Sequence, residues 1–136
     1  MVKEIVKDEA FLSQKSAPAT PEDIQIGEDL RDTLKANEER CVGLAANMIG
    51  ELKNIIVVSD EGKFIVMYNP KIVRSADKYN AEEGCLSLEG TRKTKRFRTV
   101  MVKYQDADFK VKIRNFSGFT AQIIQHEVDH CNGVII

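Results

Sequence analysis

Two histidines and a glutamate near the end of the sequence have a spacing that suits metal chemistry. His126 and His130 are four residues apart, and Glu127 follows the first of them. On an α-helix, side chains four residues apart lie on one face, so both imidazoles can bind one metal ion. In this H-E-x-x-H arrangement the glutamate is the general base that takes a proton from water. A chance match on an amphipathic helix is the alternative, but the chain has no other histidine.

A third metal ligand must lie earlier in the chain. Six residues follow His130, and among them Cys131 lies about 100° around the helix from it. Without a further histidine, the ligand is a thiolate or a carboxylate. Cys85, in the stretch E-G-C-L-S, is the strongest candidate, because Gly84 allows close approach and Leu86 follows with a free backbone N–H. One thiolate and two imidazoles leave a fourth position open for water, which is typical of a catalytic site.

The other two cysteines are expected to be small apolar residues of the interior. Three cysteines are an odd number in a chain without a recognisable secretion signal, which argues against a disulfide framework. Most free cysteines in proteins are buried and inert. Cys41 and Cys131 are interpreted in this way.

Helical signals stand at the two ends of a strand-rich middle. Thr20 and Pro21 resemble a helix start, and the apolar spacing that follows predicts a helix from about 21 to 39. Ser117 can cap a second helix that ends near Asn132. Stretches rich in β-branched residues predict strands at 55–59, 64–70, 71–75, 99–105 and 109–116, the last two forming a hairpin. The fold class expected is α+β, with small antiparallel or mixed sheets packed around the C-terminal metal-binding helix.

Length and composition favour one domain over residues 1–136. A chain of this length with 43% hydrophobic residues can bury one core and is short for two. The formal net charge of −1 lacks the basic footprint of a nucleic-acid-binding protein, and the basic run from Arg92 to Arg98 is expected to be a solvated hairpin face. No stretch has the length of a signal peptide's apolar core or of a membrane span, so we expect a cytoplasmic protein with no membrane contact.

Three sequence blocks resemble those of the peptide deformylases, which remove the formyl group from the starting methionine of new bacterial proteins. The family's E-G-C-L-S stands at residues 83–87, and its Q-H-E-x-D-H followed by glycine stands at 125–130 with Gly133. The resemblance runs from about Leu12 to Ile136. It implies a hydrolase that acts on N-formylmethionyl nascent peptides and releases formate, and it allows a transient contact with the ribosome.

The resemblance also implies roles for the candidate residues. Cys85, His126 and His130 would hold one divalent metal, ferrous iron in cells, with zinc or nickel as alternatives in purified protein. Glu127 would be the general base and then the acid, and the Leu86 N–H would help to stabilise the oxyanion.

Substrate-binding residues follow from the same resemblance. Val42 and Gly43 would meet the substrate backbone, as would Gly84 of the second block. Val42, Leu86 and Ile123 would line the pocket for the methionine side chain.

The first block departs from the family pattern G-x-G-L-A-A-x-Q. Here it reads C-V-G-L-A-A-N-M, so Cys41 replaces the first glycine and Met48 replaces the glutamine. In the family that glutamine donates a hydrogen bond to the developing oxyanion, which a thioether cannot do. Losing one such donor costs about 3 kcal/mol, or roughly a hundredfold or more in rate. Asn47 has an amide one position earlier and is an uncertain substitute.

Alternative functions remain open from the sequence. One is a relative with an intact metal site but weak activity because of Met48; another is a metallopeptidase that uses the same helix on internal peptide bonds. A structural metal module would need a fourth protein ligand, and none is convincing. The resemblance also implies that Asp129 and Arg96 form an ion pair that orients the site, with an ordinary surface salt bridge as the alternative.

Overall fold

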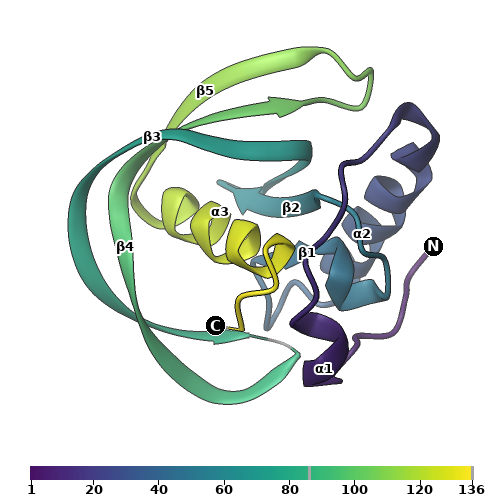
Figure 1. Cartoon of the computed structure of the whole chain (residues 1–136), viewed down its shortest axis with the longest axis horizontal. Coiled ribbons are helices and arrows are strands. Elements are labelled where there is room, and N and C mark those ends of the chain that lie inside the picture. Colours follow the sequence, from purple (N-terminus) through teal and green to yellow (C-terminus); the bar gives the residue numbers. More distant parts are fainter. Residues whose placement is uncertain (86, 136) are drawn as a thin grey trace.

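A five-stranded antiparallel sheet wraps around the C-terminal helix in the computed structural model, which describes residues 1–85 and 87–135 (Figure 1). The strands follow one another in the sheet in chain order. The helices are α1 (Glu9–Leu12), α2 (Ile24–Ala36) and α3 (Gly118–Cys131), with 3-10 turns η1 (Pro21–Asp23) and η2 (Ala46–Ile49). The strands are β1 (Gly43–Ala45), β2 (Ile55–Asp60), β3 (Lys63–Cys85), β4 (Leu88–Gln105) and β5 (Val111–Ser117). The α+β prediction is therefore confirmed, with one antiparallel sheet where small sheets were expected.

The first predicted helix forms, but it is shorter than expected. The backbone N–H of Thr20 donates to the Asp23 carboxylate at 2.8 Å, which fixes the chain entry. The first turn is 3-10, and α2 then ends at Ala36 instead of residue 39. Leu30 and Leu34, one turn apart, are fully buried and hold the helix on the sheet.

The predicted strands 64–70 and 71–75 are parts of the single strand β3. Pro70 lacks an N–H, and the pairing of β3 with β4 shifts register between Tyr68 and Lys71. The chain nevertheless continues, because the Asn69 side chain exchanges hydrogen bonds with the backbone of Ala19 and donates to Gln105. The dipeptide at 69–70 is thus an irregularity inside a strand and does not separate two strands.

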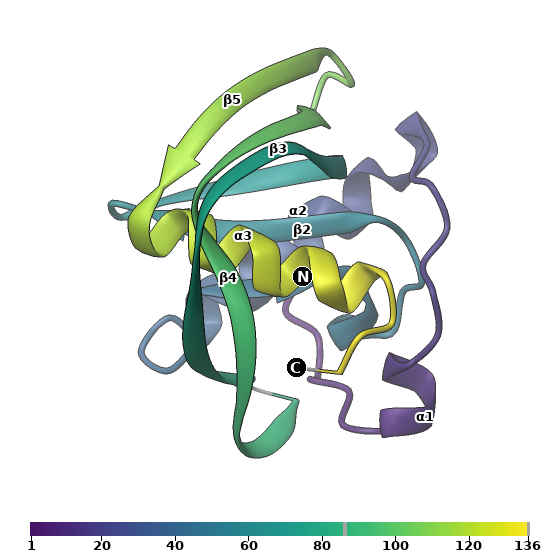
Figure 2. The same cartoon turned by 60° about the vertical axis from the view of Figure 1, so that its left-hand side comes forward.

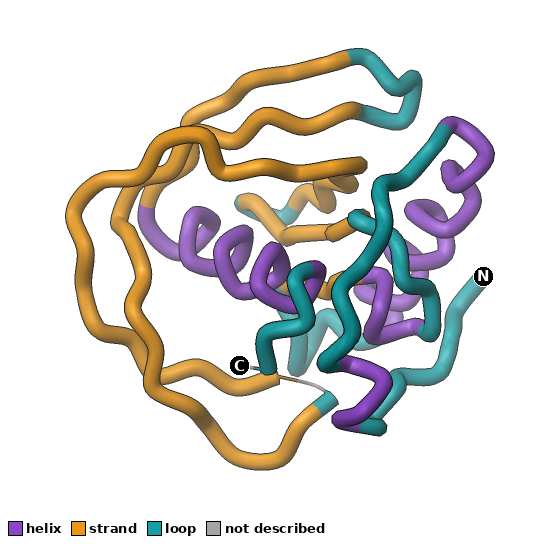
Figure 3. The backbone as a smooth tube through the Cα atoms, in the orientation of Figure 1, coloured by secondary structure: helices purple, strands orange, loops and turns teal. Residues whose placement is uncertain are grey.

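The β3–β4 hairpin extends well beyond what the sequence predicted. Its outer part, roughly residues 76–85 and 88–98, continues beyond the other strands and curves around α3 (Figures 2 and 3). Few apolar residues occur there, so no alternating pattern marked it as a strand. Lys93, Lys95 and Arg98 are exposed as expected, whereas Arg96 is buried. The predicted hairpin of β4 and β5 is confirmed.

The strand β2 has a helix on each side (Figure 2). Its first four residues, Ile55–Val58, are all fully buried, as expected for a strand with both faces covered. Helix α3 packs against β1, β2 and β4, while α2 packs against β1, β2 and β3. Among the described residues, no helix has the length and apolar character needed to span a membrane.

The ends of α3 are fixed by backbone geometry. Ser117 has the extended conformation of an N-cap, but its side chain makes no capping hydrogen bond, so that part of the prediction is wrong. The helix ends at Cys131 as the stop signal indicated. Gly133 has φ of 75°, and a Cβ there would lie 2.4 Å from the Ser13 carbonyl oxygen. Glycine therefore allows the chain after α3 to pass against the N-terminal segment.

Candidate metal centre

Helix α3 and the end of β3 bring the three predicted metal ligands together. One ligand atom from each of Cys85, His126 and His130 lies within 4.8 Å of the others. The two imidazole Nε2 atoms are 3.1 Å apart, a separation that suits two nitrogens bonded to one ion at about 2.0–2.1 Å. The i, i+4 spacing aligned the imidazoles, and the path of β3 supplied the thiol. The donor set fits a divalent transition metal.

Glu83 fixes the orientation of the first imidazole. His126 Nδ1 lies 2.8 Å from Glu83 Oε1, and because a carboxylate only accepts, Nδ1 carries the proton. The Nε2 lone pair of His126 is then directed at the ligand cluster. Sequence reasoning gave Glu83 no role. Its position two residues before Cys85 on a strand, and so on the same face, was the signal that could have identified it.

Arg96 neutralises this carboxylate. It contacts Glu83 at 2.7 Å and Asp129 at 2.7 Å, and its side chain is only 4% exposed. The expected Arg96–Asp129 ion pair is therefore present, as one half of a larger network. Burial acts to raise the pKa of Glu83, but hydrogen bonds from His126 and Arg96 lower it to about 2. Glu83 thus remains ionised opposite the imidazole.

The site favours a positive charge. Burial acts to lower the pKa of His126, yet its hydrogen bonds with Cys85 and Glu83 raise that pKa to about 10. Surroundings that stabilise a proton on the ring also stabilise a metal cation next to it.

Glu127 is a buried carboxylate next to the cluster. Its residue is 4% exposed, and its Oε1 has no hydrogen-bond partner among the described residues. Burial raises the pKa of Glu127 to about 7, with the charge of His126 acting in the opposite direction. A Cβ on Gly43 would lie 2.6 Å from an Ile123 methyl and 3.0 Å from Glu127 Oε2, so glycine lets β1 approach α3 here. A carboxylate with a pKa near neutrality can both accept and return a proton.

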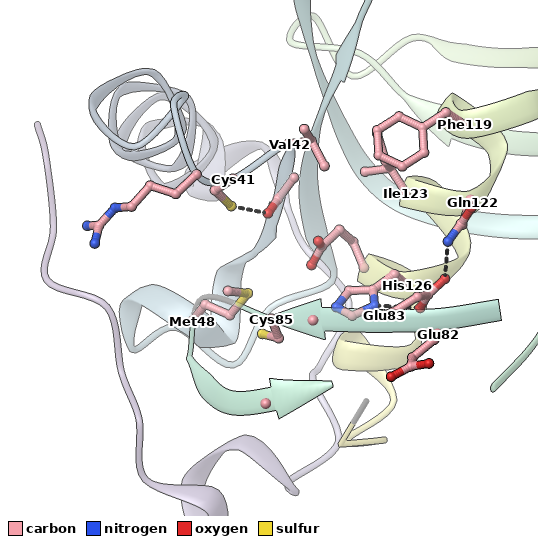
Figure 4. Close-up of a pocket in the computed structure, with 15 residues that line it drawn as sticks. Cys41, Val42, Met48, Glu82, Glu83, Cys85, Phe119, Gln122, Ile123 and His126 are labelled. Carbon is pink, nitrogen blue, oxygen red and sulfur yellow. Dashed lines mark hydrogen bonds and ion pairs between the residues drawn. The ribbon is translucent and has the colours of Figure 1, made fainter. Parts of the chain in front are cut away.

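A cavity of about 480 Å³ opens beside Glu127 and the ligands (Figure 4). All four described residues that were expected to bind substrate line it, namely Val42, Gly43, Gly84 and Ile123. Seven further lining residues had been given no role at the site: Arg40, Cys41, Glu82, Glu83, Gly90, Phe119 and Gln122. Leu86, the expected oxyanion donor, lies outside the described residues.

Met48 and Asn47, the two residues considered at the position of the family's glutamine, point in different directions. Met48 lines the cavity, while its residue is fully buried. The Asn47 amide instead donates to the backbone oxygens of Leu12 at 3.3 Å and His130 at 2.9 Å. Asn47 does not appear among the described residues around the cavity. This geometry argues against Asn47 as a substitute donor, because its N–H groups already bind the protein backbone.

Only one of the two remaining cysteines is the buried residue expected. Cys131 is 4% exposed, whereas Cys41 is half-buried and lines the cavity. The Cys41 thiol lies 2.9 Å from the Gly43 carbonyl oxygen, to which it can donate. Burial, reinforced by the charge of Glu127, raises the pKa of Cys41 to about 12. The thiol is therefore protonated at neutral pH and is not a nucleophile.

A helix that presents two imidazoles and a glutamate to a thiol on a neighbouring strand has the chemistry of a metal-dependent hydrolase. Residues 2–136 match the family model described as polypeptide deformylase. The chain belongs to this family of hydrolases, which remove N-formyl groups.

Individual relatives agree along the whole chain. A peptide deformylase of Clostridium beijerinckii is 54% identical over 136 residues, which are all of both chains. A class I type b peptide deformylase of Acinetobacter baumannii, solved with Met-Ala-Ser bound, has a TM-score of 0.88 at 30% identity and covers 99% of this chain and 97% of its own. The peptide deformylase of Thermotoga maritima has a TM-score of 0.88 at 28% identity, covering 99% and 95%.

Proposed function

We propose that this chain hydrolyses the formyl group from N-formylmethionyl nascent polypeptides and releases formate. The observation that carries the proposal is the convergence of Cys85, His126 and His130 beside the buried carboxylate of Glu127, at a cavity of about 480 Å³. Family membership and the Met-Ala-Ser complex of the Acinetobacter baumannii enzyme support this substrate class.

The three ligands would hold one divalent metal. Ferrous iron is the proposed ion in cells, because a thiolate with two imidazoles accommodates it, and zinc or nickel can take its place in preparations. When bound, the ion supplies a Lewis acid for the formyl oxygen and makes water more acidic. Cys85 and ferrous iron are both oxidisable, so activity should decay in air.

Glu127 is the proposed proton carrier. Its unpartnered oxygen can accept the proton of the attacking water, and its pKa near neutrality allows it to pass that proton to the leaving amine. Glu83 and Arg96 keep the neighbouring imidazole in one orientation during these steps. Glu127, the proposed catalytic residue, is thus buried near the charges of Glu83 and Arg96, which stay in place during the reaction.

Substrate positioning is assigned to the cavity walls. The backbones of Val42, Gly43 and Gly84 would contact the peptide, and Val42 with Ile123 would contact the methionine side chain, as all four line the cavity. Leu86 is kept as the proposed oxyanion donor through its backbone N–H. The proposal also includes one domain over residues 1–136. It places the protein in the cytoplasm, in transient contact with the ribosome.

A deformylase with a slow chemical step is the second candidate. Met48 occupies the cavity wall where the family places a donor, and the Asn47 amide is bound elsewhere. This arrangement favours a correctly folded metal site with a weakened oxyanion interaction.

One experiment tests the proposal directly. Formate release from formyl-Met-Ala-Ser is measured anaerobically, with the metal content determined on the same sample. We expect turnover in proportion to bound metal, and a loss of at least a hundredfold in Glu127→Ala at equal metal content, since a positioned acid–base group contributes about 10²–10⁴-fold. Normal turnover by a metal-loaded Glu127→Ala protein would refute the mechanism, and cleavage of an unformylated peptide would indicate a peptidase.

A further inference from the structure

Gln122 connects the wall of the cavity to the metal ligand His126. It lies one helical turn before His126 on α3, and it also lines the cavity (Figure 4). Its Nε2 donates to Glu83 Oε2 at 2.9 Å, and its Oε1 accepts from the Tyr79 hydroxyl at 3.1 Å. A polar side chain in this wall is thus bound at both ends of its amide.

The orientation of this amide is determined by its neighbours. A carboxylate can only accept, so the Glu83 side must meet the NH₂ group of Gln122, and the Tyr79 hydroxyl must then donate to the carbonyl. Tyr79 is itself held, because the Arg98 guanidinium lies 4.7 Å from the centre of its ring. The amide of Gln122 is therefore oriented by Glu83 on one side and by Tyr79 on the other.

Gln122 supplies one of the two donors to the Glu83 oxygen that lies away from the imidazole. Glu83 Oε2 accepts from Gln122 and from Arg96 Nε, both at 2.9 Å. Glu83 Oε1 accepts from His126 Nδ1 at 2.8 Å and from Arg96 Nη2 at 2.7 Å. Without the Gln122 amide, Oε2 would lose one of two donors in a buried site. Arg96 would still hold the carboxylate from one side, but the carboxylate could rotate about the Arg96 contacts, and the His126 ring would turn with it.

We propose that Gln122 is a positioning residue that, through Glu83, holds the His126 imidazole in its metal-binding orientation and links that orientation to the wall contacted by the substrate side chain. The proposal builds on the proposed metal site, and its kinetic part also rests on the proposed function. Metal release is measured without substrate, so a failure of turnover is distinguishable from a failure of this proposal.

The test compares Gln122→Leu, which removes both hydrogen bonds and keeps much of the volume, with Tyr79→Phe. Tyr79 is not among the described residues that line the cavity, so its variant weakens the Gln122 amide contact without changing the wall. Cobalt-loaded proteins are mixed with excess chelator and the rate of metal loss is followed, together with the visible absorption bands of the cobalt ion.

We expect metal loss to be about threefold to tenfold faster in Gln122→Leu, somewhat less than the 10–100-fold effect of removing a ligand's direct partner. Tyr79→Phe should show a smaller change in the same direction, and both should shift the cobalt bands. On formyl-Met-Ala-Ser, Gln122→Leu should lower kcat and change KM, whereas Tyr79→Phe should lower kcat alone.

Thr120→Val provides the matched control on the same helix. It removes the hydrogen bond from Thr120 to Asp60 at 3.0 Å, which does not involve Glu83. Metal loss in this control should equal that of the unsubstituted chain. If Gln122→Leu changes only KM, or if it loses metal no faster than Thr120→Val, Gln122 is a wall residue alone and the proposal is overturned. Should Gln122→Leu not fold, an unchanged cobalt spectrum and rate in Tyr79→Phe would overturn it equally.

Discussion

Replacing Met48 by glutamine should accelerate the chemical step. Met48 is fully buried in the turn after β1 and lines the cavity, and its sulfur accepts from the Ala45 N–H at 3.5 Å. Glutamine has nearly the same length, so its carbonyl oxygen can take over the Ala45 N–H while its NH₂ group faces the cavity. The substitution thus adds a donor without removing the existing contact.

The magnitude follows from what one oxyanion donor contributes. Removing such a donor costs about 2.7–4 kcal/mol, roughly 10²–10³ in kcat, which sets the upper limit of the gain. We expect about ten- to hundredfold in kcat with little change in KM, because the interaction forms in the transition state and not with the bound substrate. The buried amide should reduce the free energy of unfolding by about 1–2 kcal/mol if its oxygen and nitrogen are partnered only in part.

The assay is steady-state formate release from formyl-Met-Ala-Ser at equal metal content. Met48→Leu is the matched control, since it keeps an apolar side chain of similar size and adds no donor; its kcat should not rise. An unchanged kcat in a folded, metal-loaded Met48→Gln protein would refute the reasoning, because it would mean that another group already stabilises the oxyanion.

Three further perturbations test the site and its support. Asn47→Ala removes two hydrogen bonds to buried backbone oxygens and should reduce the free energy of unfolding by about 2–3 kcal/mol in urea denaturation, with an unchanged result contradicting the anchoring role. Glu83→Gln should weaken metal affinity by about 10–100-fold in a chelator competition, because the neutral amide no longer accepts a charge-assisted bond from His126; equal affinity would show that the ring needs no carboxylate. Removing the metal with a chelator should lower Tm. For an ion present at a thousand times its Kd, the free energy of unfolding should fall by about 4 kcal/mol, and restoring the ion should reverse the loss.

Local sequence patterns determined which segments form helices and strands and which side chains share a face of them. The four-residue spacing placed His126 and His130 on one face of α3, and the alternating residues of β4 with the turn that follows predicted the β4–β5 hairpin. Cys85 was also predicted as the third ligand, because the ligand set needed another member and Cys85 stood in a stretch that allows close approach, and the structure places its sulfur near both imidazoles. For the helix and the hairpin, the relevant periodicity lies within one segment of the chain.

Only the tertiary structure decided how those segments meet. Glu83 and His126 are 43 residues apart, and they touch because β3 and β4 bend around α3. The bent stretch has no alternation of apolar residues from which the sequence could have predicted it. The same packing turned the Asn47 amide to the backbone of α3 and left Met48 at the cavity. Which side of a turn faces the site depends on how the whole core fills space, since a close-packed interior accepts one arrangement of buried side chains. No spacing within residues 41–48 carries that information.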